Sequence, residues 1–219
     1  MKTLKIDGIE KEFFITPGSL YSIKIESNKQ FMNVVNSLLS FDEEKVIYSE
    51  NYTMKPLSKY SLLITNVFDI SLNDKKRLQT LYKKICSDYK LKFEDELHLI
   101  NQRIINVLKD LRIELNSNIV FNVDLDLCKL LEVYKVSYEE TLDMSFLEKL
   151  ILFVKSYLDI QDIKILFLID SIKYLSNDEV HIFLKEMGYL GITVFDIFYE
   201  RPTFDIGNLS VIDEDFCEL

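Results

Sequence analysis

Short apolar runs separated by turns occupy both ends of the chain, and the pattern of these runs is that of β-strands. The expected strands lie at 2–6, 11–15, 20–26, 45–48, 61–65, 165–169 and 192–198. Helices are expected over 29–40 and 176–187. The runs at 61–65 and 165–169 are apolar enough to be buried on both faces, and strand, helix and strand alternate over 165–198. The pattern therefore predicts an α/β fold with a central sheet.

The middle of the chain has a different pattern, because residues 57–187 contain neither glycine nor proline and their apolar positions recur with the period of helices. The apolar residues form two stripes, at Leu78, Leu81, Tyr82, Ile85 and Tyr89 and at Leu97, Ile100, Ile104, Leu108 and Leu111. Shorter helices are expected at about 124–133 and 143–158. We therefore expect a discontinuous head domain, residues 1–71 and 159–219, and an inserted α-helical leg domain, residues 72–158.

Composition excludes several classes of protein. Hydrophobic residues make up 48% of the 219 residues, which is incompatible with a generally disordered chain. The first residues contain no apolar signal region, and no stretch approaches the ~20 apolar residues that span a bilayer. We therefore expect a cytoplasmic protein without a membrane partner.

Cysteine and histidine usage argues against a metal-dependent or nucleophilic enzyme. Cys86, Cys128 and Cys217 are far apart in the sequence, and His98 and His181 belong to no Cys/His cluster. The pattern indicates neither a disulfide framework nor a zinc site, and we expect reduced thiols. A nucleophile–base pair is equally unsupported.

Positive charge is concentrated in segment 73–92, which carries a net charge of +5 in a chain whose formal net charge is −10. On a helix, Lys76, Lys83 and Lys90 lie opposite the first apolar stripe, with Arg77 and Lys84 beside them. Such a face is either an ordinary solvated surface or a surface that follows DNA phosphates without reading bases. One helix offers few phosphate contacts, so DNA binding would require several copies in an oligomer.

Two other segments have residues that could carry chemistry. The loop 26–30 occupies the place of a phosphate-binding loop but has no glycine, and Asp170 follows an apolar strand where an ATPase would hold magnesium. We expect no bound nucleotide. After the long helix, oxygen-bearing side chains are dense, which fits either calcium ligands or a capped, solvated loop. They are Glu114, Asn116, Asn118, Asn122, Asp124 and Asp126.

Two stretches resemble a known family, the Csn-two accessory protein of type II-A CRISPR adaptation in its short form. One is 164–171 (KILFLIDS) with 175–180 (LSNDEV), 192–195 (ITVF) and the acidic ending 212–216 (IDEDF), and the other is 130–136 (LLEVYKV). The resemblance implies a head similar to P-loop ATPases with a degenerate nucleotide loop, a helical leg and a homotetrameric ring. Family members bind double-stranded DNA, preferentially at free ends, through lysines that line the ring.

The resemblance also implies cofactors and partners. Calcium supports the tetramer in the family, and this sequence keeps Glu114, Asp124 and Asp126 in the corresponding stretch. The family acts with the adaptation integrase proteins and the type II effector nuclease during spacer acquisition. We therefore expect a non-catalytic, ring-forming protein that binds double-stranded DNA ends in bacterial antiviral defence. A P-loop-like ATPase, or a protein–protein scaffold without DNA binding of its own, remains an alternative.

Overall fold

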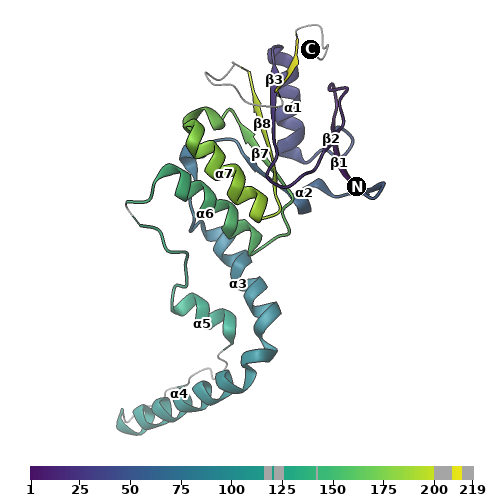
Figure 1. The fold of residues 1–219 in the computed structure, drawn as a ribbon. Coiled ribbons are helices and arrows are strands. Elements are labelled where there is room, and N and C mark those ends of the chain that lie inside the picture. Colours follow the sequence, from purple (N-terminus) through teal and green to yellow (C-terminus); the bar gives the residue numbers. More distant parts are fainter. Residues whose placement is uncertain (116–119, 121–125, 142, 200–208, 214–219) are drawn as a thin grey trace. The chain divides into compact units, whose positions relative to one another are not determined.

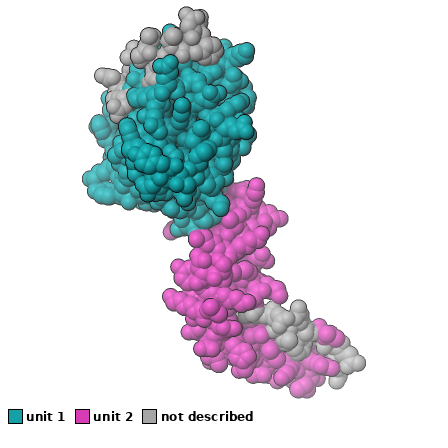
Figure 2. Space-filling model, turned by 90° about the vertical axis from the view of Figure 1, so that its right-hand side faces the viewer, with its two compact units in different colours: residues 1–72, 141–219 teal, residues 73–140 magenta. Residues whose placement is uncertain are grey.

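The structure is a computed structural model that describes residues 1–115, 120, 126–141, 143–199 and 209–213. The chain divides into two compact units (Figure 2). Unit 1 comprises residues 1–72 and 141–219, and unit 2 comprises residues 73–140.

A parallel sheet is the centre of unit 1. Among the described residues its strands are β3 (Leu20–Ile25), β6 (Ser61–Ile64), β7 (Ile165–Ile169), β8 (Thr193–Phe198) and β9 (Leu209–Ile212). Their order is β6-β7-β8-β3-β9, and each neighbouring pair is parallel. Every residue of β8 is buried, as expected for a strand covered on both faces, which explains why its sequence is apolar except for Thr193 and Asp196.

Helices cover both faces of this sheet (Figure 1). One face packs against α6 (Phe146–Leu158) and α7 (Asn177–Tyr189). The other packs against α1 (Asn28–Ser40). Both α6 and α7 begin with a capping box, in which Ser145 pairs with Glu148 and Ser176 with Glu179.

A second, antiparallel sheet was not expected from the sequence. Its described strands have the order β2-β1-β4-β5 and are β1 (Lys2–Ile6), β2 (Phe13–Phe14), β4 (Val46–Glu50) and β5 (Thr53–Lys55). The expected strands 2–6, 11–15 and 45–48 therefore lie outside the central sheet. Leu4, Phe13 and Tyr48 share one core with Ile23 and Phe195 of the parallel sheet, so burial alone does not separate the two sheets.

Helix α6 corrects the expected boundary between the two parts of the chain. Residues 143–158 were assigned to the helical leg, but Leu147, Leu150 and Val154 of α6 lie in the core of unit 1. The boundary therefore falls between residues 140 and 141 instead of between 158 and 159. The reason is that an amphipathic helix on a sheet and one in a helical lobe have the same apolar period.

Unit 2 consists of helices with a small core. Its described helices are α3 (Lys75–Tyr89), the 3-10 turn η2 (Leu91–Phe93), α4 (Glu94–Glu114) and α5 (Leu127–Val133). Leu81 and Tyr82 of α3 and Leu127 of α5 are buried, whereas no residue of α4 is. The second apolar stripe, expected to be core, is therefore exposed within the described chain, with Ile100 and Ile104 each 41% accessible.

The cysteines also differ from expectation. Cys86 of α3 and Cys128 of α5 form a disulfide, with their Cα atoms 5.9 Å apart. Their separation of 42 residues hides this proximity in the sequence. The expectation of reduced thiols is therefore wrong for this pair in the structure, and Cys217 lies outside the described residues.

Candidate functional site

The basic segment begins as a well-capped helix. The Asp74 side chain accepts hydrogen bonds from the backbone amides of Lys76 (3.0 Å) and Arg77 (3.2 Å), which satisfies two amides that the first turn leaves open. Lys76 and Lys83 lie on α3 and are exposed, and Lys90 is its exposed C-cap residue. We call these three residues the basic face. Residues seven apart on a helix are about 10.5 Å apart along its axis, so the basic face is a row of separate ammonium groups.

The two residues expected beside this row do not extend it. Arg77 is only 6% accessible, so its side chain is not part of the exposed row. Lys84 is exposed but lies 3.4 Å from the carboxylate of Asp88, which offsets its charge. Helical geometry places a residue at an angle on the helix but does not tell which neighbours will cover it, so Arg77 is buried where an exposed position was expected. Its role as a DNA contact stays a prediction. The basic face itself remains untested as a DNA site.

The carboxyl ends of β6 and β7 border a cavity of about 300 Å³. Asp170, directly after β7, has a left-handed backbone (φ 51°) and forms an ion pair with Lys173. This hydrogen bond to Asp170 raises the pKa of Lys173. Ligands in parallel α/β sheets bind at this end of the strands, so the position is the natural one for a small-molecule site. The carboxylate of Asp170, however, is already paired with the ammonium group of Lys173.

The loop between β3 and α1 is also engaged in local structure. Glu26 pairs with Lys24 at 2.5 Å, and the Ser27 hydroxyl accepts a hydrogen bond from the backbone amide of Gln30 as the N-cap of α1. A phosphate-binding loop presents several backbone amides to its ligand and relies on glycine for close approach. The residues here place a carboxylate at that position instead, which disfavours a bound phosphate.

Asp196 is a buried acid that the sequence pattern did not single out. It lies on β8, is 2% accessible, and accepts hydrogen bonds from the amides of Ser171 (3.1 Å) and Ile172 (3.4 Å). Burial raises the pKa of Asp196 to about 7. The signal in the sequence was a single acid within the otherwise apolar run 192–198. Its contacts fix the loop after β7, so it acts as a structural anchor.

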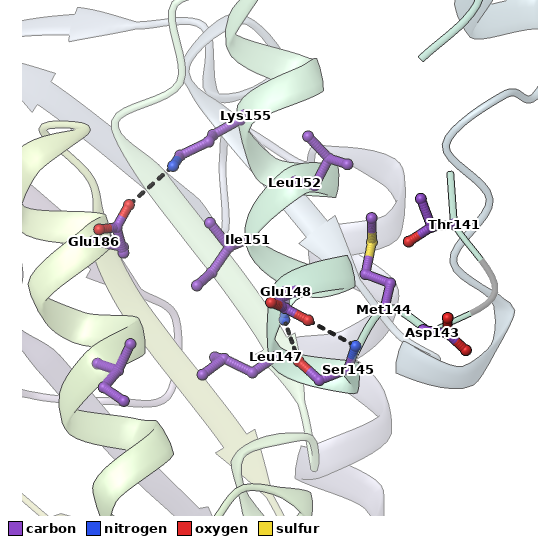
Figure 3. A pocket seen from close by; sticks show the side chains of 11 residues that line it. Thr141, Asp143, Met144, Ser145, Leu147, Glu148, Ile151, Leu152, Lys155 and Glu186 are labelled. Atoms are coloured by element: carbon purple, nitrogen blue, oxygen red, sulfur yellow. Dashed lines mark hydrogen bonds and ion pairs between the residues drawn. The ribbon is translucent and has the colours of Figure 1, made fainter. Parts of the chain in front are cut away.

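A groove of about 710 Å³ lies on the surface of unit 1 where α6 and α7 meet (Figure 3). Ile151 and Leu152 of α6 line it, and Lys155 of α6 spans it to Glu186 of α7 at 2.9 Å. Glu148 accepts a backbone hydrogen bond from Ser145, which lowers the pKa of Glu148. The polar side chains around this groove therefore hold helix ends and helix pairs together, and they present no arrangement of a nucleophile and a base.

The comparison with known families shows which family the chain belongs to. The family model described as CRISPR-associated protein (Cas_Csn2) matches residues 39–216, which is most of the chain. The chain belongs to the Cas_Csn2 family. None of the curated proteins matches it. Membership indicates a CRISPR-associated role and confirms the resemblance found in the sequence.

The Cas_Csn2 match includes all of unit 2, and with it the residues expected to bind calcium. Glu114 ends α4 and is exposed, whereas Asp126 caps α5 by accepting a hydrogen bond from the backbone amide of Lys129 at 2.8 Å. Asp124 lies outside the described residues. Among the residues that are described, no three acidic, histidine or cysteine side chains gather as a metal site would require.

The described helices of this Cas_Csn2 chain include none that is long and apolar enough to cross a membrane.

Proposed function

We propose that the chain is a non-catalytic, ring-forming protein that binds double-stranded DNA ends during CRISPR spacer acquisition. The observation that carries this proposal is the basic face, because Lys76, Lys83 and Lys90 are exposed in a chain of net charge −10. A local positive row on an acidic protein attracts a polyanion at one place and discourages binding elsewhere. Membership of a CRISPR-associated family supports DNA as that polyanion.

Oligomerisation is the second part of the proposal. Three lysines neutralise few phosphates, and affinity at physiological salt rises steeply with the number neutralised, so a single copy would bind weakly. The exposed apolar residues of α4, which include Ile100, Ile104 and Leu111, support assembly because apolar side chains gathered on one exposed helix face are typical of an interface. A homotetramer would bring four basic faces to one DNA molecule.

Calcium and protein partners complete the proposal. We infer that Glu114, Asp124 and Asp126 contribute to a calcium site that supports the assembly, since carboxylates are the ligands calcium prefers. The partners inferred from the family resemblance are the adaptation integrase proteins and the type II effector nuclease. The α6–α7 groove of unit 1, whose lining is part polar and part apolar, is a candidate surface for such a contact.

A P-loop-like ATPase is less well supported by the residues. Glu26, Ser27 and Asp170 are engaged in local contacts at the positions where an ATPase would hold phosphate and magnesium. A scaffold without DNA binding would leave the basic face without a role.

Replacing Ile100 and Ile104 by aspartate should dissociate the assembly, because each change buries a charge in the proposed interface. The native mass, measured by light scattering, should fall from that of a tetramer to that of a smaller species, and DNA binding should weaken with it. Leu39→Asp is the control, since Leu39 is also exposed (54%, against 41% for Ile100 and Ile104) but lies on α1 in unit 1. A wild-type chain that is monomeric, or a double variant that stays tetrameric, would refute this interface.

A further inference from the structure

The disulfide of unit 2 lies at one end of a row of contacts between α3 and the segment that carries α5. At the other end, Asn73 Nδ2 donates to the carbonyl of Tyr138 (3.0 Å) and the Tyr138 amide donates to Asn73 Oδ1 (2.9 Å). Between the two ends, the Tyr82 hydroxyl donates to the carbonyl of Val136. Cys86–Cys128 is therefore the last of these attachments before the chain continues into α4.

The described part of unit 2 buries few apolar side chains. Its described buried apolar side chains are those of Leu81, Tyr82 and Leu127, and α4 buries none. The disulfide therefore joins the two ends of the segment between residues 86 and 128, which includes the whole of α4. We call this segment the α4 lobe. Because so few apolar side chains are buried here, the disulfide should determine how often α5 separates from α3 and the α4 lobe opens.

The bonded cysteine of α3 also borders the basic face. At 100° per residue, Cys86 lies about 60° from Lys83 and about 40° from Lys90 around the helix axis. Both cysteines are partly accessible, so small thiol reagents can reach them.

We propose that Cys86 and Cys128 are a reversible oxidation site that reacts with small disulfides such as oxidised glutathione and controls opening of the α4 lobe. The Cys86 thiolate attacks one sulfur of oxidised glutathione, and one glutathione leaves as a thiolate that takes up a proton. The Cys128 thiolate then attacks the Cys86 sulfur of the mixed disulfide and releases the second glutathione. Two protein thiols are oxidised, and one glutathione disulfide is reduced to two thiols.

The intracellular setting of this proposal rests on the proposed function, because a protein that handles DNA in spacer acquisition works where thiols are kept reduced. Disulfides under such conditions are usually transient or redox-sensing. The disulfide in the structure is then the oxidised form of a cysteine pair that alternates between dithiol and disulfide. Its oxidised form holds α5 against α3, and its reduced form leaves the two helices without this covalent link.

The test uses the full chain carrying Cys217→Ser, so that the pair supplies the only thiols. The protein is equilibrated with mixtures of oxidised and reduced glutathione, free thiols are counted by alkylation and mass spectrometry, and trypsin cleavage within the α4 lobe is timed. We expect two thiols to disappear together across the series, and cleavage to be at least about tenfold faster in the reduced form.

Cys86→Ser and Cys128→Ser, each in the same background, are the matched controls. Both should be cleaved at the reduced rate whatever the glutathione ratio. Two outcomes would overturn the proposal: thiols that stay reduced, or stay bonded, at every ratio, and cleavage rates that do not depend on oxidation. Neither measurement involves DNA, so a failure here is distinct from a failure of the proposed function.

Discussion

Reversing the charge of Lys76 and Lys83 to glutamate should weaken binding of linear double-stranded DNA by at least about tenfold near 150 mM salt. Both side chains are exposed on one row of α3, so each subunit would neutralise two fewer phosphates and would carry two repulsive charges instead. The dependence of affinity on salt should also become shallower, by about 0.9 in the logarithmic slope for each phosphate that is no longer neutralised. Fluorescence anisotropy with labelled DNA over a salt series measures both effects.

The matched control places the same two charge reversals on unit 1, at Lys59 and Lys185. Both lysines are exposed, and the double variant has the same net charge as Lys76→Glu with Lys83→Glu. It should keep most of the affinity, and both variants should keep the wild-type native mass. Equally weakened binding in the two variants would mean that DNA responds to net charge alone and that the basic face is only a solvated surface.

Asp196→Asn should raise the free energy of unfolding of unit 1 at pH 7 by roughly 2–4 kcal/mol. The ordinary pKa of this carboxyl, 3.8, applies to the unfolded chain, and burial raises it to about 7 in the folded protein. At a pH between these two pKa values, the unfolded chain has released the proton that the folded chain still binds. The free energy of unfolding therefore falls as pH rises from about 4 to about 7. Asparagine keeps the oxygen that accepts hydrogen bonds from the amides of Ser171 and Ile172 and removes the titration.

Urea unfolding at a series of pH values measures this effect. The difference in stability between wild type and Asp196→Asn should be small near pH 4 and grow until about pH 7. Asp143→Asn, at an exposed carboxyl, should leave the pH dependence of the wild type unchanged. A difference that is constant with pH would show that Asp196 is not titrating in this range.

Most of the central sheet was predictable because its inner strands are buried, whereas the half-buried edge strand β9 was not expected. Continuous apolar runs give β6, β7 and β8 within about one residue at each end, and the absence of glycine and proline marks the helical middle. The second sheet was not separable from the first, because strands 2–6 and 20–26 have the same apolar character and face a common core. Pairing between strands is a long-range property that a local pattern does not contain.

The candidate site was predictable only in part. The angular positions of Lys76 and Lys83 follow from the helix period, and both are exposed as expected. Cys86 meets Cys128 because α5 packs on α3, and Arg77 is buried by neighbours outside its own helical turn. The sequence of α3 alone specifies neither outcome. Asp196 shows the same limit, since its partners are the backbone amides of a loop 25 residues away.

Binding to linear DNA compared with covalently closed circular DNA of the same sequence tests the central claim most directly. The comparison is made with native mass recorded in parallel, and with and without calcium. A ring that loads at free ends should retain linear DNA and release the circle at moderate salt, with a tetrameric mass that calcium stabilises. Equal retention of both DNAs, or a monomer indifferent to linear DNA, would contradict the account.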